Sequence, residues 1–213
     1  ASQIAFEIAG TEKMRLSSSG NLGIGTTSPS SLLHLGGATN KGIEITSSTS
    51  NAGYLGVYQN QAIFSINRDG ADGSFADTGK AAAVIKMHSA DADSKIELQT
   101  TTSNNAEPTT RMTILKSGNV GIGDTSPTRE LSLKKTTDHS IMAITTGTST
   151  LAGIVMGDTG ADDQGGVIYN NSGDYLYFRT GGAERLRILN GGGLTFNGDT
   201  AGANALDDYE EGT

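Results

Sequence analysis

Residues 17–29 read SSSGNLGIGTTSP, and this stretch decides the fold class. Its two large apolar side chains, Leu22 and Ile24, alternate with glycines, which is the period of a β-strand and not of a helix. Gly20, just before them, is a turn signal because glycine readily takes a positive φ. Nearly the same string returns at 116–127 as KSGNVGIGDTSP. A repeated strand with so few side chains predicts an architecture of small β-units.

The two copies align without a gap when Met14 is placed on Met112. A third, degenerate copy lies at 185–199, where Leu194 and Phe196 take the apolar places. We call each copy a connector, and we predict a structural role in joining chains for its apolar and glycine positions. In the two better copies these positions are Gly20, Leu22, Gly23, Ile24 and Gly25, and Gly118, Val120, Gly121, Ile122 and Gly123.

A connector cannot be stable by itself. It offers roughly four apolar side chains worth about 1.5 to 3 kcal/mol each when buried, against roughly a dozen residues that each cost about 1 to 2 kcal/mol to order. Gly23 and Gly25 leave one face of the strand bare while Leu22 and Ile24 fill the other. We therefore expect another strand to approach the bare face, with several chains wound around a common axis. Pro29 is expected to end the second strand.

The rest of the chain also reads as β-structure. Two segments are helix candidates, 80–88 and 201–211, but both are short, so we expect at most a turn or two of helix. Apolar residues alternate with polar ones between turn residues in five triplets. These predicted strands include residues 14–16, 43–45, 96–98, 131–133 and 186–188.

Two inserts separate the connectors and resemble each other. Residues 45–57 read like 144–156, and 84–100 read like 167–180. We attribute much of the difference in length to a longer loop within 59–83. The expected division is a first connector at 1–35, a β-rich insert at 36–109, a second connector at 110–135, a second insert at 136–182, and a third connector with the tail at 183–213.

Composition excludes several classes of protein. Of 213 residues only 35% are hydrophobic and 30 are glycine, so one large globular core is not expected. The net charge is −8 and no basic run exceeds Lys134-Lys135, which argues against nucleic-acid binding. Without cysteine there are no disulfides or thiolate metal sites, and no apolar run is long enough to insert into a membrane. The chain begins at Ala1, and we expect a processed product or a segment of something longer.

No residue pattern predicts catalysis, a cofactor or a metal. The aspartates within 67–77 do not have EF-hand spacing and read as a solvated turn, as do those within 158–163. His34, His88 and His139 are far apart in sequence; copies of one could ring a metal on a threefold axis, but a structural or exposed role is the expectation. GNLGIG departs from the dinucleotide fingerprint, and no GxSxG occurs. We expect a protein that is not an enzyme and has no cofactor.

Three strings carry a family resemblance: EKMRLSSSGNLGIGTTSPSSLLHL at 12–35, RMTILKSGNVGIGDTSP at 111–127 and ALDDYEEGT at 205–213. They resemble tail fibres and related receptor-binding appendage proteins of bacteriophages, especially marine ones. The resemblance implies an all-β, elongated homotrimer of small β-modules, joined by intertwined connectors of β-prism or triple β-helix type. It also implies an extracellular place in the virion, other tail proteins as partners, and attachment to a host-surface glycan or protein receptor. In many relatives a cleaved C-terminal chaperone follows the last string.

Two other functions stay open. One is a polysaccharide-degrading tailspike, for which Glu210-Glu211 could supply paired acids, although aromatic residues for stacking sugars are few at 5%. The other is a bacterial extracellular trimeric adhesin or filament. If receptor binding occurs in this chain, loops 67–79 and 158–166 are the expected carriers, because loops on a rigid scaffold vary freely.

Overall fold

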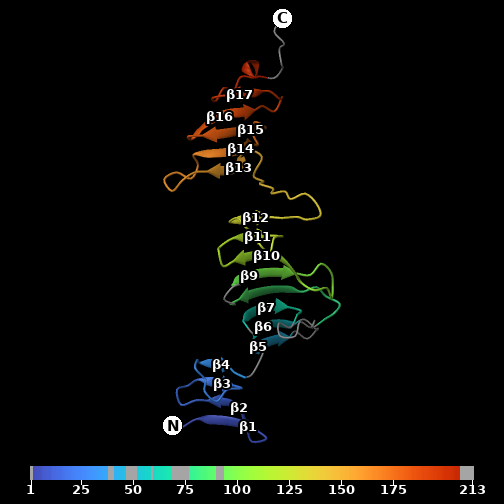
Figure 1. Cartoon of the computed structure of the whole chain (residues 1–213), viewed down its shortest axis with the longest axis vertical. Helices are drawn as coiled ribbons and strands as arrows, with labels where there is room; N and C mark the ends of the chain where they lie inside the picture. The colour runs from blue at the N-terminus through green and yellow to red at the C-terminus, as the bar shows by residue number, and fades with distance from the viewer. Residues whose placement is uncertain are drawn as a thin grey trace. The chain divides into compact units, whose positions relative to one another are not determined.

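The computed structural model describes residues 2–37, 41–46, 52–58, 60–68, 77–89 and 94–206, and these residues form an all-β protein. Their strands make three sheets that follow one another along the chain (Figure 1). One 3-10 turn, Gly202–Asn204, is the helical element among them, as expected of the tail. The chain divides into two compact units, Ala1–Ile141 and Met142–Thr213.

The first sheet has four strands: β1 (Ile4–Ile8), β2 (Thr11–Leu16), β3 (Leu22–Ile24) and β4 (Leu33–Leu35). The pairs β1/β2 and β2/β3 are antiparallel hairpins, and the second of them turns at Gly20 as predicted. The pair β3/β4 is parallel, although only the segment 25–32 separates its strands.

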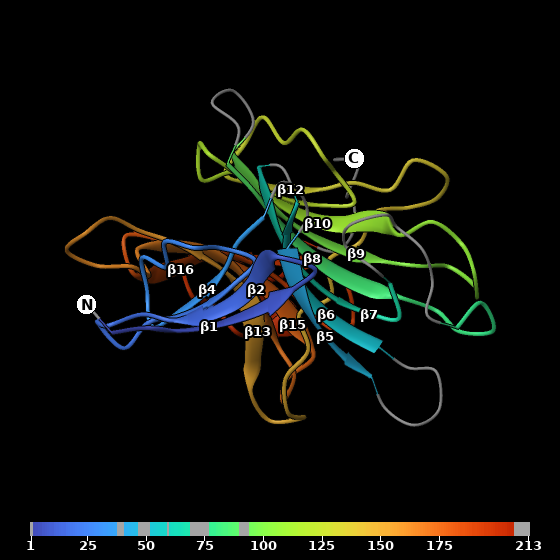
Figure 2. The same ribbon diagram turned by 90° about the horizontal axis from the view of Figure 1, so that it is seen from below.

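The second sheet contains eight strands in sequence order, from β5 to β12. All neighbours are antiparallel except the last pair, β11/β12, which is parallel like β3/β4. The strands β5 to β9 fan out in Figure 2, which displays the twist from strand to strand. The strands are β5 (Lys41–Thr46), β6 (Ala52–Tyr58), β7 (Gln61–Ile66), β8 (Ala83–His88), β9 (Lys95–Thr100), β10 (Thr109–Leu115), β11 (Val120–Ile122) and β12 (Leu131–Leu133).

The third sheet has five antiparallel strands. It ends at the third connector, where Leu206 forms a bridge with Leu194 in place of a parallel strand. Its strands are β13 (Leu151–Met156), β14 (Gly165–Asn170), β15 (Tyr175–Thr180), β16 (Ala183–Ile188) and β17 (Leu194–Phe196).

One face of each sheet is apolar and open. Directly paired residues lie on the same side of a sheet, so the register defines ladders of side chains across all the strands. In the second sheet one ladder runs through Ile43, Leu55, Phe64, Ile85, Leu98, Met112, Ile122 and Leu133. The ladder through Phe6, Met14, Ile24 and Leu35 and the ladder through Ile154, Val167, Phe178, Leu186 and Phe196 repeat this pattern. We call this side of each sheet the apolar face.

The opposite side of the second sheet, the covered face, is buried by the chain itself. Ser65, Glu97 and Thr113 are buried there. The side chain of Asn67 donates hydrogen bonds to the carbonyls of the segment 77–81 and receives one from the Asp77 amide, which ties that segment over the sheet. Ile63 and Val84 are buried on this face as well, so the chain covers a mixed polar and apolar layer while the apolar face stays open.

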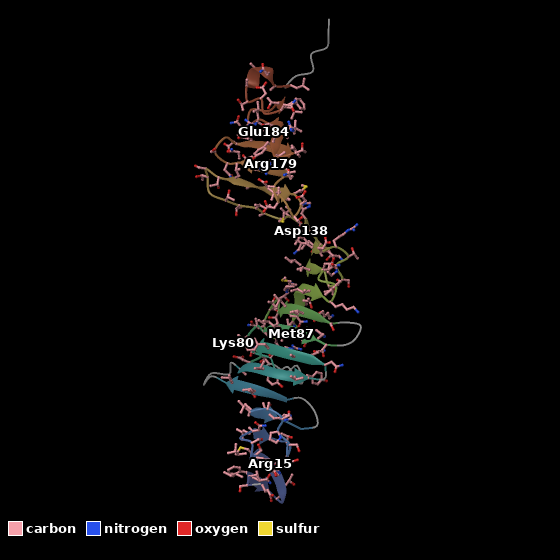
Figure 3. All side chains as sticks on the ribbon, turned by 90° about the vertical axis from the view of Figure 1, so that its left-hand side faces the viewer. Arg15, Lys80, Met87, Asp138, Arg179 and Glu184 are labelled. Atoms are coloured by element: carbon pink, nitrogen blue, oxygen red, sulfur yellow. The ribbon has the colours of Figure 1, made fainter. Side chains whose placement is uncertain are left out.

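The apolar face leaves large side chains in solvent. Phe64 is 50% exposed and Leu98 is 39% exposed, in the middle of the eight-stranded sheet. Met87, labelled in Figure 3, projects from β8 on the same face, and it is paired with Ile96. Among the described residues, no other segment of the same chain packs over this face.

Two sequence predictions about the inserts are wrong. The helix candidate 80–88 is largely the strand β8, whose residues alternate between the two faces of the sheet. The segment 59–83 is not only loop, because it contains β7. As a result the alignment of 45–57 with 144–156 does not match the topology: β6 is separated from β8 by β7, whereas β13 pairs directly with β14.

The five predicted triplets are confirmed as strands, in β2, β5, β9, β12 and β16. The second connector is continuous with the insert before it. Strand β10 pairs with β9, and in the same way β16 pairs with β15. The second and third connectors therefore lie at the ends of the sheets that begin in the inserts before them.

Candidate functional site

The turn of each connector is built on a glycine with positive φ. Gly20, Gly118 and Gly192 have φ of +83°, +88° and +86°. Each donates its N–H to the carbonyl three residues earlier, at 3.0, 2.9 and 3.1 Å. The turn predicted from Gly20 and Gly118 is confirmed, and the third copy shares it despite its different sequence.

A second positive φ follows the short strand of every connector. Gly25 and Gly123 have φ of +73° and +70°, and Asn197 takes their place in the third copy with φ +55°. Asparagine tolerates this left-handed region better than most side chains. The three amides donate equivalent hydrogen bonds of 2.8, 2.8 and 3.0 Å to the carbonyls of Lys13, Arg111 and Arg185.

A crossover returns the chain to the far side of the short strand in the first two connectors. The side-chain amide of Asn21 donates to the carbonyl of Pro29 at 3.1 Å, and the Leu22 amide donates to the Leu32 carbonyl at 2.8 Å. The strand ends at Ile24, so the prediction that Pro29 ends it is wrong. The proline instead lies within the crossover, where its carbonyl holds the hairpin.

The glycine face of the connector is filled by the same chain. A Cβ on Gly23 would lie 2.8 Å from the Thr26 carbonyl oxygen and 3.3 Å from Pro29 Cβ. On Gly121 it would overlap the Asp124 carbonyl oxygen. The close approach predicted from the glycines is present, but the crossover makes it, so the prediction of a bare face open to another strand is wrong.

The apolar positions of the connectors point to the apolar face. Leu22, Val120 and Leu194 are half-buried, while Ile24, Ile122 and Phe196 are exposed. Leu22 pairs with Leu33 and Ile24 with Leu35, so the parallel strand extends the same surface. The apolar side is therefore the part of the connector that remains available to another chain.

Two connectors carry a forked ion pair on the strand before the turn. Arg15 donates to both carboxylate oxygens of Glu12 at 2.7 and 2.6 Å, and Arg187 donates to Glu184 at 2.8 and 2.7 Å. The hydrogen bond from Arg15 lowers the pKa of Glu12. We did not predict these pairs, although EKMR and ERLR show matching spacings. Thr113 replaces the arginine in the second copy and is fully buried.

The covered face of the second sheet holds a buried carboxylate. The Glu97 carboxylate lies 3.0 Å from Lys95 Nζ and 3.1 Å from His88 Nε2. It also accepts a hydrogen bond of 3.1 Å from Gln99 Nε2. Burial raises its pKa, but the hydrogen bonds and charges of Lys95 and then His88 outweigh it, so the net pKa is lowered. A carboxylate held ionised by Lys95 and hydrogen-bonded to His88 joins β9 to β8.

The metal and loop predictions have mixed outcomes. Asp158 accepts hydrogen bonds from the Gly160 and Ala161 amides, which is the geometry of a turn. Across residues 2–37 and the other described segments, no three His, Asp or Glu side chains gather closely enough to hold a metal ion. Four of the acidic residues considered above lie outside the described residues: Asp69, Asp72, Glu210 and Glu211.

The comparisons with known proteins add no relative. No model of a known protein family matches the chain, and no curated protein matches it. No helix in the described segments is long and apolar enough to cross a membrane.

Proposed function

We propose that this chain is a structural and attachment segment of a homotrimeric extracellular fibre of the bacteriophage tail type. Its role is mechanical and adhesive, without catalysis. One observation supports the proposal most: the same uncovered apolar ladder occurs in three successive sheets, while the opposite side of the large sheet is covered by the chain's own loops.

An exposed surface of this kind favours association. Soluble monomers rarely expose large continuous apolar patches. Burying one large apolar side chain contributes about 1.5 to 3 kcal/mol, and each ladder offers several. Near the centre of the second sheet, Phe64, Ile66, Ala83, Ile85 and Leu98 surround a depression of about 290 Å³ that is almost wholly apolar. Side chains of another copy would fill such a depression.

Copies of the same chain are the occupants that suit the surface best. Each of the three sheets repeats one ladder pattern, so each could pack its apolar face against the same sheet of a second copy. Three copies around one axis would close the surface, which is the arrangement that the family resemblance implies. Trimeric presentation would also add avidity to weak individual receptor contacts.

This function is tested by finding where the protein is located, on viral particles or on cells. Gold-labelled antibodies against the purified protein would be applied to viral particles and to cells of the organism that encodes it. Label on tail appendages is the expected result. Label on the cell surface in the absence of particles would instead favour a bacterial adhesin, and digestion of host capsule by the purified protein would favour a tailspike.

A further inference from the structure

A pocket of about 370 Å³ opens beside the second connector. Three segments form its walls: the start of β9, the β10–β11 turn, and the crossover before β12. The register brings the first two together, because Lys95 pairs with Leu115. Its lining includes Lys95, Lys116, Ser117, Thr125, Ser126 and Pro127.

The lining is cationic and lacks carboxylates. Its polar side chains are lysines and hydroxyls, all of which can donate hydrogen bonds. This composition is unusual in a chain with 23 acidic and 15 basic residues. Glu97 and Asp124 lie beside the pocket, on Lys95 and on the Ser126 amide, so Lys116 and the hydroxyls are the donors that suit an anionic ligand.

Several of these donors are available. Lys116 makes no ion pair within the residues that the structure describes. The Ser117 hydroxyl accepts the Asn119 amide at 3.4 Å, which leaves its own proton free to donate. Lys95 contacts Glu97 at 3.0 Å, so its charge is balanced, while its ammonium has further N–H groups. The unbalanced charge of the pocket is that of Lys116.

The fold does not require a lysine at this place. The residue at the matching position is Ser18 in the first connector and Asn190 in the third, and both keep the turn with its positive-φ glycine. The cation therefore belongs to this pocket and not to the architecture of the connector. Leu115 and Pro127 add an apolar wall on which the C–H face of a sugar ring can lie.

We propose that this pocket binds the oxyanion of an acidic polysaccharide, with Lys116 as its charge partner and the hydroxyls of Ser117, Thr125 and Ser126 as further donors. The carboxylate, sulfate or phosphate would point to Lys116, and the ring would lie against Pro127. This inference rests on the proposed attachment function and gives its receptor a chemical class.

The test measures binding of the full-length protein, in its native oligomeric state, to three immobilised probes: polygalacturonate, dextran sulfate and neutral dextran. Each is examined by biolayer interferometry at low and at high salt. The variant is Lys116→Ala. The matched control is Lys135→Ala, which removes the same charge from an exposed residue of the same unit, outside the pocket. Thermal melts verify that both variants fold.

We expect at least one anionic probe to bind more tightly than dextran, and we expect Lys116→Ala to weaken that binding about tenfold, which corresponds to roughly 1.4 kcal/mol. Lys135→Ala should change it by less than about twofold, as expected of a screened surface charge. The probe that binds distinguishes a carboxylate from a sulfate. Equal losses in the two variants, or no preference for either anionic probe, would overturn the pocket. Light scattering on the same sample measures the oligomeric state separately. A failure of the glycan-binding proposal can therefore be distinguished from a failure of the proposed fibre.

Discussion

The side-chain amide of Asn119 donates a 3.0 Å hydrogen bond to the carbonyl oxygen of Pro127. This bond joins the β10–β11 hairpin to the crossover that places β12 parallel to β11. Parallel strands usually need a connection of about a dozen residues or more, so a crossover this short needs local support. The pair Asn21 and Pro29 repeats the bond in the first connector.

Replacement of Asn119 by aspartate tests the importance of this bond. The new carboxylate would have no N–H to donate and would place a negative charge beside the carbonyl, so we expect Asn119→Asp to lower the free energy of unfolding by about 1 to 3 kcal/mol. Urea denaturation measures the change. The control is Asn104→Asp, which adds the same charge at an exposed loop residue. Equal losses in the two variants would mean that the crossover does not depend on the amide.

Gly121 and Gly160 should respond differently to valine. At Gly121 a Cβ would overlap the backbone of Asp124, whereas at Gly160 its nearest neighbour would be the flexible Asp158 carboxylate, 3.3 Å away. Overpacking typically costs about 1 to 3 kcal/mol, so Gly121→Val should lower the melting temperature by several degrees more than Gly160→Val. Indistinguishable melting curves would contradict the close packing of the crossover on β11.

The Glu97 cluster predicts a specific acid sensitivity. The pKa of Glu97 is lowered from its ordinary value of 4.5, with Lys95 as the cationic partner, His88 as a further hydrogen-bonding partner and Lys86 paired directly across the strand. A group with a lowered pKa in the folded state stabilises the protein above its unfolded pKa, and this stability is lost as the pH falls through the folded pKa.

Glu97→Gln should remove that part of the pH dependence. Between about pH 5 and pH 2, the free energy of unfolding of the natural chain should fall more steeply than that of the variant, as followed by denaturant melts at each pH. Glu130→Gln is the control, because Glu130 is an exposed carboxylate that forms no ion pair within the described residues. Parallel pH profiles for natural chain and Glu97→Gln would show that the cluster contributes no acid sensitivity.

Much of the local structure could be predicted from the sequence. Alternation over residues 14–16 or 131–133 is a direct consequence of side chains pointing to opposite faces of a strand, and Gly118 is the residue type that a positive φ requires. The helix candidate at 80–88 is wrong because helix propensity, even that of alanine and lysine, is a small free energy per residue, and the pairing of β8 with β7 and β9 overrides it.

The parallel crossover and the covered face could not be predicted from the sequence. The bond from Asn21 to Pro29 depends on a backbone path that no side-chain period reports. Glycines such as Gly23 indicate that something comes close, but they do not identify it; the structure assigns the approach to Thr26 of the same chain. The apolar ladders required the register, since a shift of one residue would reverse the two faces.

A charge placed in the apolar ladder should separate the copies. Ile85 lies in the middle of the second sheet between Phe64 and Leu98, and its side chain is already 39% exposed in the single chain. We expect Ile85→Glu to shift the oligomer to a lower mass in size-exclusion chromatography, because three buried carboxylates would face one another. Leu32→Glu, at a residue 80% exposed and outside the strands, should leave the elution volume unchanged. Equal shifts would show that the ladder is not the contact surface.

The mass of the assembled protein in solution tests the central claim, which is that the apolar faces of three chains cover one another. Multi-angle light scattering coupled to size-exclusion chromatography should give three times the chain mass of 21.9 kDa, independent of dilution over about a hundredfold range. A folded species of 21.9 kDa would contradict the account, and a mass of two chains would contradict its threefold arrangement.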